Sequence, residues 1–433
     1  MSEHNGAPRR VLITGIGAVT NLGGTAPTTW DAMVSGRSGI TRFGDTYPGF
    51  AKWTEDHWAS RVTGEIHDLT PAAALSPREV KKLDRFAVLG ITAGIEAVGD
   101  SGLDFASDQI ERERCGVIIG SGIGGMLTIE DGHAVLAERK PDRMNPFTVP
   151  KLMANAVTGD LSIRYGLEGH SGSHTTACAS SGHSIAEAHQ LIRRGRADVM
   201  IAGGAEGCIC SLTLAAFMTM KALSTRNDDP QKASRPFDKD RDGFVLAEGA
   251  AVFVLESESH ARARGATIYG ELLGAAASSD ATHITAPDAE GRGAKRAMRW
   301  ALEEAGCNAT DIDYINAHGT STPLGDAAEV HAALGLFGDH ARSSAGGTLL
   351  MSSTKSMTGH CLGASGAVEL VACLGAIRHG VIPPTINLDQ PDDEFDIDLV
   401  PNTAREQTVR YAMNNTFGFG GHNVSMVVGA DRG

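Results

Sequence analysis

Residues 93–125 read AGIEAVGDSGLDFASDQIERERCGVIIGSGIGG, and residues 297–325 follow the same plan in AMRWALEEAGCNATDIDYINAHGTSTPLG. Each stretch predicts a helix that ends at a glycine, then a polar connection that contains aspartate. A short apolar strand follows and runs into a loop of small residues. Because the same order of elements occurs twice, the sequence indicates a duplicated unit.

Two further pairs of segments repeat in the same order. Residues 175–199, TTACASSGHSIAEAHQLIRRGRADV, are similar to residues 358–382, TGHCLGASGAVELVACLGAIRHGVI. Each of these two segments begins with a turn, continues with Ser-Gly and then has a predicted helix, which ends at a basic residue followed by glycine. Residues 242–256 and 417–429 are each a glycine-rich turn followed by an apolar strand. These matches extend the duplication over most of the chain.

The three matches predict two halves, residues 1–265 and residues 266–433. Strands that alternate with helices indicate an α/β fold, for which we expect mostly parallel sheets covered by helices. In such a fold the loops at the strand ends carry the chemistry, and equivalent loops of two duplicated halves are expected to meet.

Composition limits the classes of protein to consider. At 433 residues the chain exceeds what one hydrophobic core usually serves. A formal net charge of -14 opposes non-specific binding to nucleic acid or to an anionic membrane. No segment approaches the roughly 20 apolar residues of a membrane span. We therefore expect a soluble protein without a nucleic-acid partner or membrane insertion, which must meet any acidic partner with a local basic patch.

The seven cysteines and the N-terminal segment indicate the compartment. The cysteines are scattered and lack the paired spacing of metal ligands, which fits free thiols in a reducing compartment. Residues 11–20, VLITGIGAVT, are β-branched and contain two glycines, so they predict a buried first strand rather than a secretory signal. The expected location is the cytoplasm.

Cys178 lies in the first of the repeated turns, directly before a predicted helix. Unpaired backbone N–H groups and the helix dipole at such a position favour a thiolate, so we expect the pKa of Cys178 to be lowered. On its own, the residue fits a small buried hydrophobic side chain at least as well. Only other residues can decide between the two readings.

Two histidines favour the catalytic reading of Cys178. His318 follows a predicted strand, and His360 lies in the turn that corresponds to the Cys178 turn in the second half. Neither histidine lies on an apolar helical face, where a buried structural histidine is expected. The duplication would bring the two turns together, so Cys178, His318 and His360 form a candidate nucleophile and acid–base site.

At this point four motifs resemble a known family. They are TACASSG at residues 176–182, NAHGTSTPLGD at 316–326, SSTKSMTGHCLGASGA at 352–367 and NNTFGFGGHN at 414–423. Together they resemble the β-ketoacyl-[acyl-carrier-protein] synthases of the thiolase superfamily, most closely the elongating synthase II type. The resemblance runs from Val11 to nearly the last residue, and motifs this long and ordered are specific. It implies a thiolase-like αβαβα fold of two duplicated halves, paired as a homodimer.

The resemblance implies a reaction and gives the candidate residues their roles. Cys178 would accept the growing acyl chain, and the backbone N–H groups of Cys178 and Phe419 would form an oxyanion hole. His318 and His360 would bind the malonyl thioester carbonyl and stabilise the enolate that forms when CO2 leaves. That enolate would attack the acyl group on Cys178. The expected product is a 3-oxoacyl carrier protein, formed in fatty acid elongation.

Other residues match supporting positions of the family. Lys355 and Glu329 are implied to form an ion pair that supports the electrostatics of the site. The remaining implied contacts are Thr320 and Thr322 with the pantetheine arm, Ile123 as a wall of the acyl pocket, and Phe419 as a gate that admits the acyl chain.

The implied partner is an acyl carrier protein in its acyl and malonyl forms. Basic residues at Arg78, Lys81, Lys82 and Lys221 resemble positions where the family receives this acidic protein, although a solvated helix face would explain them equally. We expect no bound cofactor, because the 4'-phosphopantetheine arrives on the carrier. We also expect no metal, since the loop that begins DKDRDG has Gly249 where a calcium loop needs glutamate.

Three alternatives remain beside fatty acid elongation. A coenzyme A-dependent thiolase is disfavoured, because thiolases carry a second cysteine in the C-terminal glycine-rich loop and this chain does not. A non-catalytic chain-length-factor-like subunit would lack the nucleophile, which is present here. A ketosynthase of a type II polyketide or aryl-polyene pathway would share every catalytic residue and stays open.

Two departures from the family pattern leave the preferred acyl chain length undetermined. The common synthase II pattern has threonine at the position of His422, and residues 338–347 form a somewhat extended loop. His174 and His183 flank the nucleophile but fall outside the motif positions, so we interpret both as structural.

Overall fold

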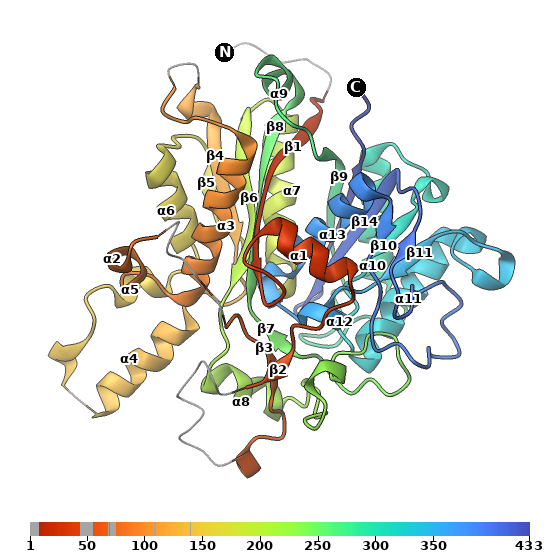
Figure 1. Ribbon diagram of the computed structural model, residues 1–433, viewed down its shortest axis with the longest axis horizontal. Coiled ribbons are helices and arrows are strands. Elements are labelled where there is room, and N and C mark those ends of the chain that lie inside the picture. The colour runs from red at the N-terminus through yellow and green to blue at the C-terminus, as the bar shows by residue number, and fades with distance from the viewer. Residues whose placement is uncertain (1–7, 44–54, 68, 70–74, 108–109, 139) are drawn as a thin grey trace.

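The computed structural model describes residues 8–43, 55–67, 69, 75–107, 110–138 and 140–433. Ten strands form one sheet in the order β11-β10-β14-β15-β9-β1-β8-β6-β4-β5, so that β1 and β9 are neighbours in the middle (Figure 1). The strands of the first half are β1 (Val11–Thr20), β4 (Cys115–Gly120), β5 (Ser171–Gly172), β6 (Val199–Glu206) and β8 (Gly249–Ser257). Those of the second half are β9 (Gly270–Ser279), β10 (Tyr314–Asn316), β11 (Leu350–Ser352), β14 (Tyr411–Gly418) and β15 (His422–Gly429).

The two halves of the sheet have the same strand order and the same strand directions. Outward from the centre, β1 pairs antiparallel with β8, β8 antiparallel with β6, β6 parallel with β4, and β4 parallel with β5. In the second half β9, β15, β14, β10 and β11 repeat this pattern in that order. The predicted duplication is therefore present in the strand topology. The predicted boundary between residues 265 and 266 falls in the loop before β9 and stays a prediction.

The expectation of mostly parallel sheets is wrong. Each half has two parallel and two antiparallel pairs, and β1 and β9 also meet antiparallel. The reason lies in the last strand of each half, β8 or β15, which runs antiparallel to both of its neighbours in that half and so accounts for both antiparallel pairs. In the second half β15 forms a hairpin with β14, to which it is joined by the short glycine turn at residues 419–421.

Helices and sheet halves form five layers, and the two central helices carry the site. Helices α3 (Arg85–Ser101) and α6 (Ala156–Tyr165) cover the outer face of the first half. Helix α10 (Arg292–Ala305) covers the outer face of the second half of the sheet and packs on α11 (Pro323–Phe337). Helices α7 (Ser180–Arg193) and α13 (Ser365–His379) lie side by side between the halves (Figure 1). This is the αβαβα arrangement.

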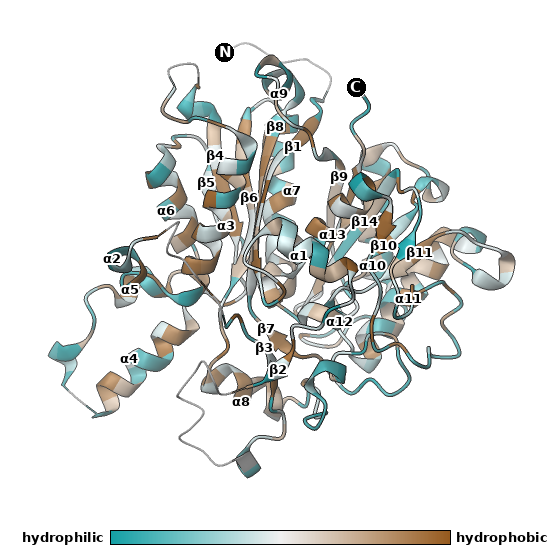
Figure 2. Ribbon diagram, viewed as in Figure 1, coloured by the Kyte–Doolittle hydropathy of each residue, from teal (hydrophilic) through white to brown (hydrophobic). Residues whose placement is uncertain are grey.

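The burial of each helix follows from its sequence. Helix α13 is buried from Ser365 to Leu374, because it contacts strands of both halves and is apolar on nearly every side. Helix α10 is amphipathic, and Ala294, Ala297, Met298, Ala301 and Leu302 face inward at helical spacing. Figure 2 shows the same distribution, with hydrophobic residues concentrated on the central strands. Each fully buried leucine or methionine contributes about 1.5–3 kcal/mol.

The remaining elements surround this core. The other helices are α1 (Ala26–Val34), α2 (Pro77–Val80), α4 (Met126–Glu138), α5 (Thr148–Leu152), α8 (Ser211–Thr219), α9 (Glu258–Ala263) and α12 (Lys355–Thr358). Small sheets are formed by β2 (Thr41–Arg42), β3 (Val62–Gly64) and β7 (Leu246–Ala247), and by β12 (Val381–Ile382) and β13 (Arg405–Glu406). Among the helices described, none combines the length and apolar character needed to cross a bilayer.

Candidate functional site

Cys178 lies in a 3-10 turn, Ala177–Ala179, that leads directly into α7. Ala177 adopts a φ of 51°, a left-handed conformation that is uncommon for a residue other than glycine and is typical of functional turns. The corresponding turn of the second half, Leu362–Ala364 before α13, has a φ of 42° at Leu362. The duplication thus repeats the local backbone conformation that presents the thiol.

Burial dominates the electrostatics of the thiol. Cys178 is 8% exposed, and burial raises its pKa to about 12, against the lowering effects of the Lys355 charge and of two backbone N–H groups. These N–H groups belong to Phe419 and to Cys178 itself, the two predicted for the oxyanion hole. The expectation of a lowered pKa is therefore wrong, because desolvation of a thiolate outweighs the helix N-terminus.

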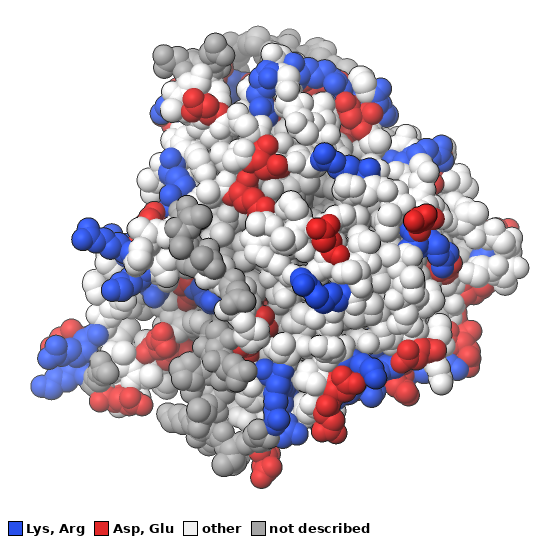
Figure 3. All heavy atoms as spheres, in the orientation of Figure 1, with Lys and Arg blue, Asp and Glu red and all other residues white. Residues whose placement is uncertain are grey.

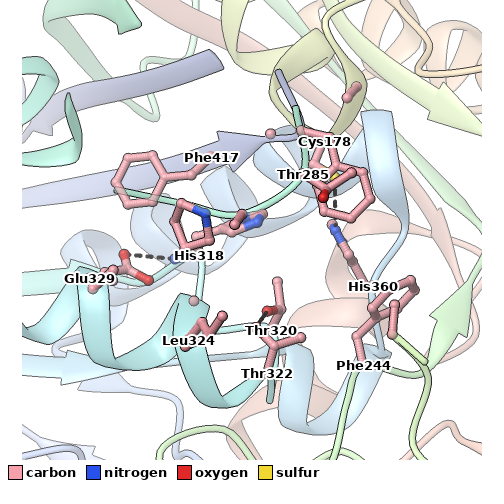
Figure 4. Close-up of a pocket in the computed structure, with 18 of the residues that line it drawn as sticks. Cys178, Phe244, Thr285, His318, Thr320, Thr322, Leu324, Glu329, His360 and Phe417 are labelled. Carbon is pink, nitrogen blue, oxygen red and sulfur yellow. Dashed lines mark hydrogen bonds between the residues drawn. The ribbon is translucent and has the colours of Figure 1, made fainter. Parts of the chain in front are cut away.

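His360 is the partner of the thiol. Its Nε2 lies 3.1 Å from Cys178 Sγ (Figure 4). Its Nδ1 lies 2.8 Å from the hydroxyl of Ser365. The backbone of His360 is fixed by a bond from its N–H to Val245 O and by one to its own carbonyl from Ala247 N–H. Burial lowers the pKa of His360 well below its usual value, and the Lys355 charge lowers it further, so the ring is neutral.

His318 faces the same cavity from the end of β10. The His318 and His360 rings are 5.2 Å apart at 83°, an edge-to-face contact. Lys355 Nζ lies 3.4 Å from His318 Nδ1 and can donate to it, which leaves the ring proton on Nε2. Burial lowers the pKa of His318 well below its usual value, with smaller effects of Lys355 and His360. The structure thus brings together two neutral imidazoles and one thiol.

The predicted ion pair between Lys355 and Glu329 is wrong, since Lys355 instead pairs with Glu369. The ammonium donates to the Glu369 carboxylate, and both side chains are buried. Burial raises the pKa of Glu369 even beside this charge. No local pattern in the sequence points to Glu369, because it lies on α13 and Lys355 on α12, and only their packing brings them into contact.

Glu329 has a different task, which is to hold the loop that carries His318. Its carboxylate accepts from the backbone N–H of His318 at 2.9 Å and of Gly319 at 2.8 Å. The side-chain amide of Asn415 donates to it at 3.1 Å. Burial raises the pKa of Glu329 to about 7, opposed by these donors and, less strongly, by the charge of Lys355. Glu329 therefore positions the histidine through its backbone.

Another buried carboxylate, Glu206 at the end of β6, was not anticipated from the sequence. It accepts from the N–H groups of Gly122 and Ile123, from the Ser121 hydroxyl, and from Gly363 N–H in the second half. Glu206 thus fixes the turn that bears Ile123 against the turn that precedes α13. A lone glutamate at a strand end gives no signal of this role before the halves are assembled.

One cavity of about 630 Å³ holds the reactive groups and most of the predicted binding residues (Figure 4). Its lining includes Cys178, His318, His360, Glu329, Thr320, Thr322, Phe419, Ile123 and Lys221. The hydroxyls of Thr320 and Thr322 lie 2.9 Å apart. Lys355 lies behind His318 rather than on the wall. The extended loop at 338–347 is not among the lining residues.

The predicted docking residues do not form one patch. Arg78, Lys81 and Lys82 line a second, open hollow of about 940 Å³ together with Arg143, whereas Lys221 lines the catalytic cavity. Lysine and arginine side chains gather at the edge of the molecule where Figure 1 places α2 and α5 (Figure 3). The side chains of Arg78, Lys81 and Lys82 are all exposed. The docking role stays a prediction.

The thiol and the two imidazoles also have the composition of a metal-ligand group. Among the described residues, the donor atoms of Cys178, His318 and His360 lie within 4.8 Å of one another, which is the spacing of a metal-ligand group. The reaction implied by the sequence leaves these atoms free for substrate, so the expectation that no metal is needed stays a prediction, as does that of no bound cofactor.

Comparisons with known proteins agree with this geometry. The family models of the "Beta-ketoacyl synthase, N-terminal domain" and "Beta-ketoacyl synthase, C-terminal domain" match residues 8–261 and 269–389. The chain is 45% identical to 3-oxoacyl-[acyl-carrier-protein] synthase 2 of Vibrio harveyi over 419 residues, which cover 97% of this chain and 98% of that protein.

Solved structures of ketosynthases superpose on almost the whole chain. A beta-ketoacyl synthase from Burkholderia phymatum STM815 matches with a TM-score of 0.88 and 34% identity, covering 98% of this chain and all of that one. A type II polyketide ketosynthase, solved with its acyl-carrier protein and bound to the hexaketide, matches with a TM-score of 0.87 and 31% identity over the same shares of the two chains.

Proposed function

The chain belongs to the beta-ketoacyl synthase family, and we propose that it elongates fatty acyl chains by decarboxylative condensation. It is an acyltransferase that joins a malonyl-acyl-carrier-protein to an acyl chain held on Cys178, giving a 3-oxoacyl-acyl-carrier-protein and CO2. The observation that carries this proposal is one buried cavity in which His360 Nε2 lies 3.1 Å from the Cys178 thiol and beside His318.

The first step is acyl transfer to Cys178. Because the thiol pKa is raised and the imidazole pKa lowered, a thiolate–imidazolium pair is not populated at neutral pH. The proton therefore moves to His360 Nε2 as the sulfur attacks the thioester carbonyl. Ser365 supports this transfer, since its hydroxyl can either donate to or accept from Nδ1. The N–H groups of Cys178 and Phe419 stabilise the oxyanion, and the carrier thiol leaves with the proton.

The second step is loss of CO2 from the malonyl group. Because the carrier thiol takes its proton from His360 Nε2, acyl transfer leaves the ring proton on Nδ1. Before the malonyl group binds, the neutral ring exchanges this proton through solvent for one on Nε2, and Nδ1 then accepts from the Ser365 hydroxyl. The Nε2–H groups of His318 and His360 are then two neutral donors to the thioester carbonyl. Negative charge builds on that oxygen as the carbon–carbon bond to CO2 breaks, so both hydrogen bonds strengthen in the transition state. The enolate carbon then attacks the acyl-Cys178 carbonyl. The Cys178 thiolate leaves and takes up one proton from solvent, which is the proton that the overall condensation consumes.

The carrier protein delivers both substrates in this proposal. Thr320 and Thr322 line the cavity, where their hydroxyls can bond the amides of a pantetheine arm. The exposed basic residues Arg78, Lys81 and Lys82 suit an acidic carrier. The polyketide ketosynthase that was solved with its acyl-carrier protein supports a carrier partner for this chain too. A cytoplasmic homodimer belongs to the same proposal.

Elongation is favoured over polyketide synthesis by the degree of similarity. The identity is 45% to a 3-oxoacyl-[acyl-carrier-protein] synthase 2 and 31% to the polyketide ketosynthase, at nearly equal coverage of this chain. Elongating synthases and polyketide ketosynthases share the catalytic residues. The sequence identity outside the site is therefore what favours elongation over polyketide synthesis.

Product analysis and two histidine variants test the proposal together. With malonyl carrier and a graded series of saturated acyl carriers, the wild-type enzyme should release 3-oxoacyl products longer by one malonyl-derived unit. His318→Ala and His360→Ala should retain some acylation of Cys178 but lose CO2 release by about 100-fold or more. His379→Ala, whose ring stacks on Trp30 at the end of α13, is the matched control.

Two outcomes would contradict the proposal. Poly-β-keto products from the wild-type enzyme would assign the chain to polyketide synthesis. Unimpaired CO2 release in either cavity-histidine variant would remove that histidine from the decarboxylation step.

A further inference from the structure

His422 opens β15, directly after the turn that carries the Phe419 N–H group. Gly420 and Gly421 follow Phe419 with φ angles of 83° and 74°. Two glycines in the left-handed region make this turn easy to form and equally easy to deform. The Phe419 N–H must nevertheless stay aimed at the position beside the Cys178 thiol where the carbonyl oxygen becomes an oxyanion. Contacts from outside the turn have to fix it.

On one side the turn is held by a neighbouring loop. Gly420 N–H donates to Ile284 O at 2.7 Å, and Asp280 N–H donates to Gly421 O at 3.0 Å. On the other side it rests on the His422 ring. A Cβ placed on Gly420 would lie only 3.1 Å from two atoms of that imidazole, so the ring packs directly on the glycine.

His422 is supported in turn by His183, in the first turn of α7. The two rings are 6.0 Å apart at 85°, the edge-to-face geometry favoured by aromatic pairs. His183 Nδ1 lies 2.9 Å from Thr176 Oγ1 and 3.1 Å from Ala179 O. These two residues lie on either side of Cys178. A continuous line of contacts therefore joins the Gly420 turn, His422, His183 and the nucleophile turn.

The charge state of His183 is settled by its environment. Burial lowers the pKa of His183 to about 4, assisted by His174 and His422, so the ring is neutral at physiological pH. The His174 ring also lies 6.0 Å from the His183 ring. The contact between His183 and His422 is therefore packing around a neutral ring, which an uncharged aromatic residue at position 422 could reproduce.

We propose that His422 is a positioning residue that holds the Phe419–Gly421 turn against the Cys178 turn, so that both backbone N–H groups stay aimed at one oxyanion. The inference rests on the proposed function, because acyl transfer and condensation both pass through an oxyanion at this point. Loss of CO2 depends instead on His318 and His360. Threonine, which the resembling synthases carry here, offers no ring to bridge Gly420 and His183.

The two partial reactions separate this role from a merely structural one. Acylation of Cys178 by an acyl carrier protein is followed in a single turnover by mass spectrometry of the intact enzyme. CO2 release from malonyl carrier protein is measured without an acyl donor. His422→Ala should slow acylation by about 10-fold or more, part of the 100–1000-fold that loss of one oxyanion donor costs. CO2 release should stay within about twofold.

Three variants complete the experiment. His422→Phe should restore most of the acylation rate, since it keeps the ring, and His379→Ala should resemble wild type because its ring stacks on Trp30 elsewhere. If His422→Ala does not fold, His422→Thr takes its place.

The outcomes distinguish this inference from the proposed function. A wild-type enzyme that does not acylate Cys178 would defeat the proposed function itself. If wild type is active, the inference on His422 is overturned by unchanged acylation in His422→Ala, by equal losses in both partial reactions, or by a His422→Phe variant as slow as His422→Ala.

Discussion

Single residues in this site have properties that depend on burial more than on their neighbours in the sequence. Cys178 stands at a helix N-terminus, which stabilises a thiolate, yet its pKa is raised to about 12 because the thiol is almost fully buried. The two cavity histidines are kept neutral for the same reason. A resting site of uncharged groups suits chemistry in which charge develops only in the transition state.

Alkylation of Cys178 tests this resting state. A thiol with a raised pKa is protonated at neutral pH. As long as the pH stays below that pKa, each increase of one pH unit raises the thiolate fraction tenfold. The rate constant for iodoacetamide modification of Cys178, followed by peptide mass spectrometry, should therefore climb about tenfold per unit from pH 7 to pH 9. A plateau between pH 7 and pH 8 would mean that the helix N-terminus outweighs burial after all.

At the scale of elements, paired turns and helices assemble the site. The turns before α7 and α13 have the same strained backbone at Ala177 and Leu362, and they place Cys178 and His360 in contact. Helices α12 and α13 are joined by the buried pair of Lys355 and Glu369. This pair fixes the ammonium behind His318, where it sets the tautomer of the ring.

A double-mutant cycle on that pair tests how the two helices are coupled. Glu369→Leu leaves a buried ammonium without its partner and should reduce the free energy of unfolding by about 3–5 kcal/mol. Lys355→Met together with Glu369→Leu should cost less than the sum of the single changes, because no charge is then left unpaired. Urea denaturation of the four proteins gives the coupling energy. The same cycle with Glu329→Leu is the control and should show weaker coupling to Lys355.

Stronger coupling of Lys355 to Glu329 than to Glu369 would restore the ion pair expected from the family resemblance. It would also contradict the contacts of Glu329 described above, which are to the backbone of His318 and Gly319 and to Asn415.

At the scale of the whole molecule, the surface charge is uneven. The chain carries a net charge of -14, yet Arg78, Lys81 and Lys82 lie together around one hollow near α2. Most of the surface would repel an acidic carrier protein, whereas these basic residues would attract it. The patch should therefore act mainly by raising the rate at which the carrier protein associates.

Charge reversal measures that contribution. Lys81→Glu with Lys82→Glu should raise KM for acyl carrier protein about 10-fold and leave kcat nearly unchanged, because the patch lies outside the catalytic cavity. Raising the salt concentration should increase KM for wild type and affect the variant less. Arg299→Glu on α10, which packs on the second half of the sheet, is the control. An unchanged KM in the double variant would end the docking proposal for α2.

The sequence by itself determined the duplication, the layered α/β class and the three residues for which we propose catalytic roles. Segments such as residues 175–199 and 358–382 repeat local patterns of turn, helix and glycine, and local patterns survive in the sequence because they arise between near neighbours. The family motifs then added the chemistry of Cys178, His318 and His360.

Only the tertiary structure decided the strand directions, the partner of Lys355, the roles of Glu206 and Glu329, and the pKa of Cys178. Each of these depends on residues that are distant in the chain and meet only when the two halves pack. Desolvation in particular is a property of the assembled interior, because the medium around a group is made by every segment that surrounds it. For that reason the residues of the site could be found in the sequence, whereas their charge states and supports could not.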